Sequence, residues 1–337
     1  HMHNIVATIQ REQNRIIRHD RGRLLIVQGP AGSGKTSAAL QRIAYLLYKY
    51  RDKLRADQII LFSPNSMFNS YVSNVLPELG EENMQQVTFQ EYLEYRLSKE
   101  FQIEDPYEQL EYMLTEADDS LYRTRTASIR FKASTRFFET IKTYCKSLEL
   151  SGMLFKDILF RGKPIITAKQ ITERFYSSDT SLRFHSRLEK LADWLNKQID
   201  EAEKLERTKP WVQEEIELLS NEDYHKAHTL LRKKHGFKAE TLNNYENEIE
   251  ALGQLIVRKK LKPLRKRIRT LRFIDMKGVY KQLFADPTRV KQWMEGETPE
   301  EWEDICRLTV KTLDEGKLFY EDATPFLFLK DLIQGFQ

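Results

Sequence analysis

The segment that most constrains this chain fits the pattern G-x-x-x-x-G-K-T and consists of Gly29, Pro30, Ala31, Gly32, Ser33, Gly34, Lys35 and Thr36. It stands between an apolar run at residues 24–27 and a helical pattern over residues 36–50, which is the strand, loop and helix order that a phosphate-binding loop requires. Glycines let the backbone take positive φ and approach an anion, so that N–H groups and the helix N-terminus face phosphate oxygens. We therefore predict that Lys35 contacts the β- and γ-phosphates of a nucleotide and that the Thr36 hydroxyl ligates Mg²⁺.

Residues 4–96 alternate between helical and strand-like patterns. An amphipathic helix is expected over residues 4–18, and short strands are expected at 57–63 and 86–89. Asn65 or Ser66 can cap the helix that follows the first of these strands. Such alternation is typical of an α/β fold with a parallel sheet, whose ligands bind at the carboxyl ends of the strands.

The length of 337 residues suits two domains, or one domain that carries an insertion. Charged residues make up 31% and apolar residues 40% of the chain, which favours a soluble, helix-rich protein. Cys145 and Cys306 lie far apart without CxxC spacing, so we expect neither a disulfide framework nor a zinc site, and we expect a reducing cytoplasm. No run approaches about 18 apolar residues, so no membrane partner is expected.

From residue 98 to about 315 we predict a helical insertion, because apolar residues recur at three- and four-residue intervals. A seam between paired helices is predicted from the spacing of Leu182, Leu188, Leu191, Leu195 and Ile199. Whether the insertion is one body or two stays open, with residues 155–164 and 275–299 as candidate joints. Residues 316–337 regain core-like composition, as if the chain returned to the first domain. The predicted long helices cover residues 106–117, 120–148, 180–204, 212–234 and 239–271.

A basic run lies near the end of the predicted insertion, and no acidic residue occurs from Ala251 to Ile274. Such a cluster favours a phosphate backbone or another polyanionic surface. The alternative is a solvated helix face whose charges pair with nearby glutamates at 246, 248 and 250. Phe273 is the only aromatic residue near the run, so a base-stacking platform is not indicated. The candidate contacts are Arg258, Lys259, Lys260, Lys262, Arg265, Lys266 and Arg267.

Glutamine and histidine side chains supply two further candidates. Gln13 or Gln10 can read the N6 and N7 edge of adenine, since an amide offers one donor and one acceptor. His225, His228 and His235 have helical spacing, but no cysteine or well-placed carboxylate accompanies them, so a metal site is not expected there.

Several of these segments together resemble the superfamily 1 helicases of the UvrD/Rep type. The similarity lies in Gln13, the 29–36 loop, the residues behind it at 41–47, the Ser63-Pro64-Asn65 stretch and the 87–89 stretch. Within that superfamily, residues 5–13 and 320–325 look most like the HelD, or helicase IV, family. The resemblance covers about residues 4–96 and 316–329, and across the insertion it depends on position and helical character alone.

The resemblance implies a RecA-like first domain over residues 4–97, interrupted by the insertion at 98–315 and resumed at 316–337. It implies ATP and Mg²⁺ as cofactors, an adenine contact by Gln13, and a nucleic-acid or coupling role for Ser63, Asn65 and Thr88. HelD proteins of Gram-positive bacteria are motor-like ATPases that release RNA polymerase from stalled or spent complexes, so RNA polymerase and DNA are the implied partners. Ser37 departs from the pattern, because relatives often carry an arginine there that stacks on the base.

A second departure concerns catalysis. Relatives hold magnesium and orient the attacking water with a D-E-x-x carboxylate pair at a strand end, and they use arginine fingers from a second RecA-like domain. Asp314 and Glu315 are not preceded by a buried strand, so we reject them and expect an incomplete, inactive part of a longer ATPase. The alternatives are a helicase that translocates on single-stranded DNA, and a scaffold that uses nucleotide only as a switch.

Overall fold

A computed structural model describes residues 2–82, 84–235 and 245–335 of the chain. The chain divides into two compact units, His1–Glu100 and Phe101–Gln337. Each unit has its own core and is described by itself. Among the described residues, no helix combines the length and the apolar composition that crossing a lipid bilayer demands.

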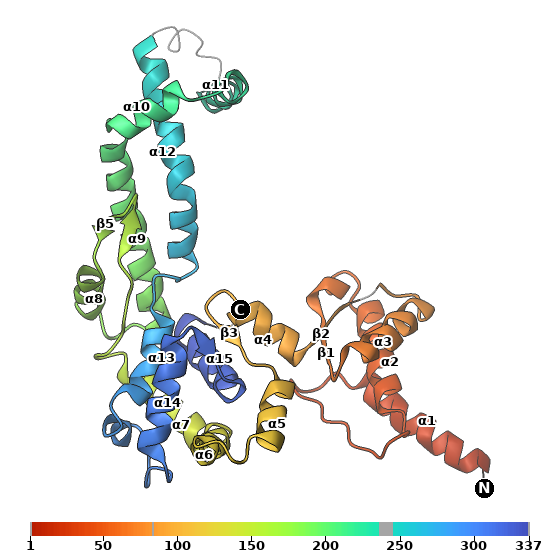
Figure 1. Ribbon diagram of the computed structural model, residues 1–337. Helices are drawn as coiled ribbons and strands as arrows, with labels where there is room; N and C mark the ends of the chain where they lie inside the picture. The colour runs from red at the N-terminus through yellow and green to blue at the C-terminus, as the bar shows by residue number, and fades with distance from the viewer. Residues whose placement is uncertain (1, 83, 236–244, 336–337) are drawn as a thin grey trace. The chain divides into compact units, whose positions relative to one another are not determined.

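The first unit consists mainly of helices around one pair of parallel strands (Figure 1). The strands pair in register from Ile60 with Gln85 to Ser63 with Thr88, so their carboxyl ends coincide. A small core of Leu40, Val72, Leu76 and Met84 fills the space beneath them. In chain order the elements are α1 (Met2–Arg18), α2 (Lys35–Lys49), η1 (Ala56–Gln58), β1 (Ile60–Ser63), α3 (Ser66–Glu78), β2 (Gln85–Thr88) and α4 (Phe89–Leu97).

The strand predicted at residues 24–27 is wrong, because this stretch is irregular in the structure. Leu24 and Ile26 are 77% and 71% exposed. A strand is stabilised by hydrogen bonds to a neighbour, and no described segment pairs with this one. The remaining predictions for this unit, a helix after the loop and two short parallel strands, are confirmed.

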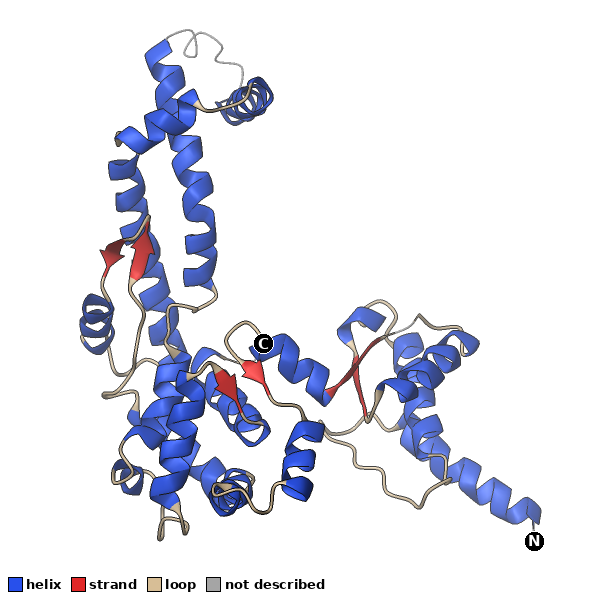
Figure 2. Cartoon of the chain, viewed as in Figure 1, coloured by secondary structure: helices blue, strands red, loops and turns tan. Residues whose placement is uncertain are grey.

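The second unit is mainly helical (Figure 2). Its lower part surrounds an aromatic core that includes Phe137, Tyr280, Phe284 and Phe326. Two short strands far apart in sequence, β3 and β6, pair in parallel there. The elements are β3 (Gln102–Ile103), α5 (Pro106–Thr115), α6 (Tyr122–Lys132), α7 (Thr135–Ser147), α13 (Met276–Ala285), η2 (Arg289–Gln292), α14 (Trp302–Asp314), β6 (Lys317–Leu318) and α15 (Tyr320–Gln334).

An arm of two long helices, α9 and α12, extends from this part of the second unit (Figure 1). Leu188, Leu195 and Ile199 of α9 are fully buried, which confirms the predicted seam from Leu188 onward, whereas Leu182 precedes the helix. Helix α12 contributes Val257, Leu261 and Ile268 to the seam. The arm also contains an antiparallel hairpin that the sequence did not predict. The arm elements are β4 (Ile158–Phe160), β5 (Lys163–Ile166), α8 (Ala168–Tyr176), α9 (Phe184–Glu206), α10 (Pro210–Glu217), α11 (Asn221–His235) and α12 (Tyr245–Arg269).

Two predicted long helices are each broken into two. The prediction at 120–148 becomes α6 and α7, because Ser134 accepts a hydrogen bond from the N–H of Phe137 and starts a new helix. The prediction at 212–234 becomes α10 and α11, with the Ser220 hydroxyl bonded to the N–H of Asp223. The prediction at 239–271 corresponds to α12, and its first residues lie outside the described chain.

The described contacts of the C-terminal stretch, residues 316–335, are with the second unit. Lys317 and Leu318 pair with Gln102 and Ile103, and α15 packs on α6 and α7. The predicted domain boundaries at 97 and 315, and the predicted return to the first domain, stay predictions about how the chain is organised.

Candidate nucleotide-binding site

The 29–36 loop has the backbone conformation that its glycines permit. Gly32 and Gly34 have φ of 78° and 84°, in the left-handed region that other residues rarely adopt. The N–H of Ser33 bonds the carbonyl of Pro30 at 3.2 Å, which closes a tight turn. Helix α2 begins directly after Gly34 without a side-chain cap. The N–H groups of its first turn therefore face outward at the positive end of the helix dipole.

Lys35 lies across this loop. Its ammonium donates to the carbonyls of Gly29 and Pro30 at 2.6 Å each, and Ser33 Oγ lies 3.5 Å away. The charge is thus held at the mouth of the loop, within reach of an anion that the loop would enclose. Thr36, the predicted magnesium ligand, follows in the first turn of α2 and is half-buried.

Helix α1 is fixed to α2 at two points. The Arg42 guanidinium donates to the carbonyls of Ile16 and Ile17 at 3.1 and 3.3 Å, and also to the carbonyl of His19. These carbonyls belong to the last turn of α1 and the residue after it, where the helix supplies few N–H partners; the carbonyl of Ile16 also accepts from the N–H of His19 at 3.4 Å. Lys49 and Asp20 form an ion pair of 2.9 Å, and the hydrogen bond from Lys49 lowers the pKa of Asp20.

This attachment brings Gln13 to the phosphate loop. A Cβ placed on Gly34 would lie only 2.8 Å from Nε2 of Gln13, so the amide lies directly against the last glycine of the loop. Gln10, the other predicted adenine contact, is exposed and lines a shallow depression on α1 with Asn14 and three arginines. Ser37 accepts a hydrogen bond from Gln41 at 3.3 Å. Of the two glutamines, the structure places Gln13 beside the loop.

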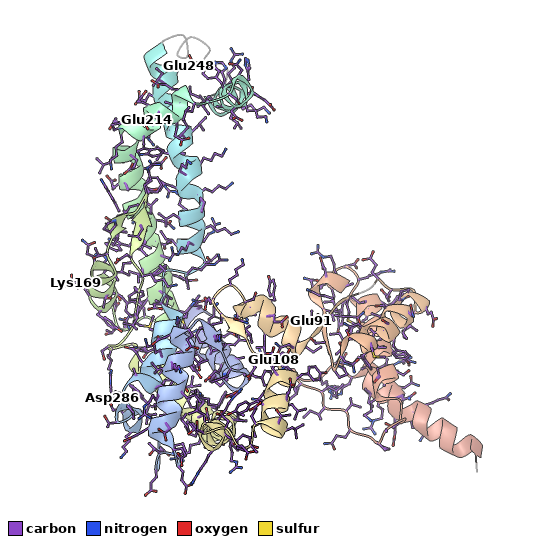
Figure 3. The ribbon with its side chains drawn as sticks, in the orientation of Figure 1. Glu91, Glu108, Lys169, Glu214, Glu248 and Asp286 are labelled. Carbon is purple, nitrogen blue, oxygen red and sulfur yellow. The ribbon has the colours of Figure 1, made fainter. Side chains whose placement is uncertain are left out.

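The predicted coupling residues Ser63, Asn65 and Thr88 all lie where β1 and β2 end. Ser63 is buried, and its hydroxyl donates to Oδ1 of Asn69 at 2.5 Å. Asn65 caps α3 by accepting from the N–H of Phe68, and Thr88 caps α4 by accepting from the N–H of Glu91, a residue labelled in Figure 3. These three polar groups are therefore engaged in local structure at this edge.

An aromatic cluster beside this edge was missed by sequence reasoning. Phe62 is 48% and Phe89 is 42% exposed, and Tyr92 packs edge-on to Phe62 with ring centroids 5.5 Å apart. The sequence of β1 could have predicted the exposure of Phe62. Side chains alternate between the two faces of a strand, so Phe62 points to the face opposite Leu61, which packs on the core.

The basic run lies on α12, and the structure divides it into two sets. Arg258 and Arg265 bond Glu203 of α9 at 2.9 and 3.0 Å, and Lys260 lies 4.0 Å from Glu215 of α10. The run is thus partly neutralised by acids of other helices. Of the three glutamates expected from the sequence, Glu248 and Glu250 form no ion pair with the described residues of the run, and the side chain of Glu246 lies outside the description. Lys259, Lys262, Lys266 and Arg267 form no ion pair with any described residue.

Other candidates from the sequence form no site. Within residues 2–82, 84–235 and 245–335, no three His, Cys, Asp or Glu side chains are grouped to hold a metal ion, and the side chain of His235 lies outside the description. His225 and His228 lie on α11. Burial raises the pKa of Cys145 and of Cys306 to about 12, so both thiols stay protonated and unreactive at neutral pH.

The acidic residues near the C-terminus are structural. Asp314 lies at the end of α14, paired with Lys281 at 2.7 Å, which agrees with its rejection as a strand-end carboxylate. Glu321 bonds the buried guanidinium of Arg125, and Asp322 bonds the buried ammonium of Lys132 at 2.9 Å. The stretch at 320–325, which helped to suggest the family resemblance, therefore holds the core of the second unit together.

The arrangement around α2 can enclose an anion between a left-handed loop, a lysine and an uncapped helix, with an amide alongside. Arg42, which positions that amide, could have been found from the sequence because it lies seven residues after Lys35 and so shares a face with it. Comparison of the chain with models of protein families, and with curated proteins, found no match.

Proposed function

We propose that this chain binds ATP with Mg²⁺ at the 29–36 loop and forms part of a HelD-like motor ATPase of the superfamily 1 helicase type. In this proposal the longer protein associates with bacterial RNA polymerase in the cytoplasm and releases it from nucleic acid. The observation that carries the nucleotide assignment is the pair of left-handed glycines that leads directly into the uncapped start of α2, with Lys35 at the loop. This combination suits the phosphates of a nucleotide.

The residues present also fit the magnesium ion and the base. Mg²⁺ keeps several waters and is commonly held by few protein oxygens together with substrate phosphates, so the single hydroxyl of Thr36 suffices on the protein side. Lys35 would exchange its two loop carbonyls for phosphate oxygens. Gln13, held beside Gly34, would offer a donor and an acceptor to the adenine edge. The D-E-x-x carboxylates are not among these residues, so we propose binding without appreciable hydrolysis for this chain.

Titration with ATP and Mg²⁺ tests the nucleotide site directly. Lys35→Ala should weaken binding by about tenfold or more, since a hydrogen bond to a charged group contributes roughly 1.5–3 kcal/mol. Lys53→Ala is the matched control, because Lys53 is an exposed lysine just beyond α2. Equal affinity of the wild type and Lys35→Ala would rule out the site.

A second comparison distinguishes recognition of the base by Gln13 from a role of Gln13 in the structure of the loop. Gln13→Ala should weaken ATP binding while leaving the affinity for inorganic triphosphate unchanged, because only the base would lose a partner. Gln10→Ala should have no effect in this geometry. An equal loss for ATP and triphosphate would assign Gln13 to loop structure rather than to base recognition.

Association with RNA polymerase is tested by gel filtration of the chain with bacterial core polymerase, at moderate salt and with excess competitor DNA. Co-elution would support the polymerase-releasing function. No co-elution, together with binding to single-stranded DNA, would favour a translocating helicase. The aromatic cluster in which Phe62 and Phe89 are exposed and Tyr92 is half-buried favours that second candidate, because bases stack on such side chains.

A further inference from the structure

Four cations form a continuous row on one face of α12. Lys259, Lys262, Lys266 and Arg269 follow one another at intervals of three, four and three residues, which places them on the same side of a helix. All four side chains are exposed, and none forms an ion pair with a described residue. The opposite side of α12 is apolar and buried, and its Val257, Leu261 and Ile268 belong to the seam with α9. We call these four residues the cationic row.

The cationic row is distinct from the other basic residues of α12. Arg258 and Arg265 turn to the flank, where the buried carboxylate of Glu203 neutralises them. Helix α9 shows the ordinary pattern of a solvated helix, since its exposed positions carry both signs, including Glu189, Lys190, Asp193 and Lys197. Of these two helices, α12 is the one whose exposed charged residues over positions 259–269 all carry the same sign.

Helix stability does not account for the row. Lysine and arginine in the last turn interact favourably with the helix dipole, and this effect can explain Lys266 and Arg269. Lys259 and Lys262 lie farther from that end. Three neighbouring like-charge pairs along the row each destabilise the helix by roughly 0.2–0.5 kcal/mol. An anionic partner would convert this repulsion into binding energy.

The geometry points to the sugar-phosphate backbone of a nucleic-acid duplex: we infer that the cationic row binds duplex phosphates without regard to base sequence. The first and last residues of the row, Lys259 and Arg269, lie ten positions apart, which is about 15 Å of helix. One strand of a duplex carries a phosphate about every 3.4 Å along its axis, so this length faces roughly four phosphates. The row itself contains no aromatic side chain, so it lacks the stacking surface by which single strands are held.

The test measures binding of the 337-residue chain to a mixed-sequence DNA duplex of roughly 20 base pairs by fluorescence anisotropy, between about 50 and 200 mM salt. The variant carries Lys259→Gln, Lys262→Gln, Lys266→Gln and Arg269→Gln. Neutralising four contacts should make the slope of log K against log salt shallower by about 3–4 and weaken binding more than tenfold at the lowest salt.

Two further variants serve as controls. Lys163→Gln, Lys169→Gln, Lys190→Gln and Lys197→Gln together remove the same charge from exposed positions of β5, α8 and α9, and should change affinity less than twofold. Lys169 is labelled on α8 in Figure 3. Replacing the three lysines of the row by arginine keeps the charge and should keep the binding, and an unchanged melting temperature confirms that the variants fold.

Several outcomes would overturn the inference. These are wild-type binding that the four substitutions leave unchanged, equal losses in the row and control variants, and tighter binding to a single strand of the same sequence. No duplex binding, with binding to polyglutamate that requires the row, would assign it to an acidic protein surface instead. Because the row and the nucleotide site share no residue, Lys35→Ala should bind duplex as the wild type does, so failure here and failure of the proposed function are separate results.

Discussion

At the scale of single residues, the last glycine of the phosphate loop meets two demands at once. Gly34 has a left-handed backbone, and the amide of Gln13 occupies the space where a side chain would begin. Gly32 has nearly the same φ, but nothing lies within 4 Å of the position of its missing Cβ. Substitution at Gly32 would therefore introduce backbone strain alone, whereas substitution at Gly34 would introduce both backbone strain and a steric clash with Gln13.

We expect Gly32→Ala to cost about 1 kcal/mol of unfolding free energy, the usual penalty of a left-handed non-glycine residue. Gly34→Ala should cost measurably more, because alanine must also displace Gln13. Urea denaturation of both variants measures the difference, and adding Gln13→Ala to Gly34→Ala should remove it. Identical costs for the two glycines would show that Gln13 moves aside without penalty.

At the scale of elements, α1 depends on one arginine of its neighbour. Arg42→Ala removes the donors to the carbonyls of Ile16 and Ile17, so the end of α1 should open more readily. We expect hydrogen exchange of α1 amides to accelerate by about tenfold, which corresponds to about 1.4 kcal/mol, while α2 amides keep their protection. Arg51→Ala, at an exposed arginine beyond α2, is the control and should leave α1 unchanged.

The two arm helices depend in a similar way on one carboxylate. The side chain of Glu203 is 7% exposed and bonds Arg258 and Arg265 of α12, and it also lies 3.5 Å from Arg207, the residue that follows α9. Glu203→Gln would leave Arg258 and Arg207 without their counter-charge, while Arg265 would keep its ion pair with Asp200 at 2.7 Å. Because those groups keep some access to solvent, we expect a loss of roughly 2–3 kcal/mol rather than the full effect of breaking a buried pair.

Glu201→Gln provides the comparison on the same helix. The side chain of Glu201 is 70% exposed, and its contact with Lys204 is 3.5 Å, so the loss should stay below about 0.5 kcal/mol. Both values come from chemical denaturation of the whole chain. Similar losses for Glu203→Gln and Glu201→Gln would contradict the role assigned to the buried carboxylate.

The elements also show where sequence reasoning succeeds. The position of α2, the two parallel strands and the apolar seam of α9 were predicted because periodicity and capping residues are local signals. The break at Ser134 was missed, since a serine inside an amphipathic pattern caps a new helix only when the chain turns there. The strand at residues 24–27 was predicted wrongly, because strand formation depends on a partner that the local pattern does not reveal.

The candidate site was predictable to a similar degree. The loop residues follow from one motif, and their backbone conformation agrees with it. The distinction between Gln13 and Gln10 needed the docking of α1, which depends on a hydrogen bond between residues 26 positions apart. The neutralisation of Arg258 depends on Glu203, which is 55 positions away. The roles proposed for Lys35 and Thr36 in nucleotide binding remain predictions.

At the scale of the whole molecule, two separate cores imply two separate unfolding events. Leu76 is fully buried in the first unit and Leu283 is fully buried in the second. Leu76→Ala and Leu283→Ala should each cost roughly 2–5 kcal/mol, and each should lower only the transition of its own unit in calorimetry. A single transition that both variants shift equally would show that the units unfold together.

The contacts of Glu203 have a mechanical consequence for the arm. Arg258 and Arg265 lie two turns apart on α12, and both contact the carboxylate of Glu203. Sliding α12 along α9 by one turn, about 5.4 Å, would therefore break these two contacts. Many paired helices can shift register at little cost, because an apolar seam repeats itself. In this arm the contacts of Glu203 oppose such a shift of register, so a displacement of one end of the arm should be transmitted to the other end as a rigid-body movement.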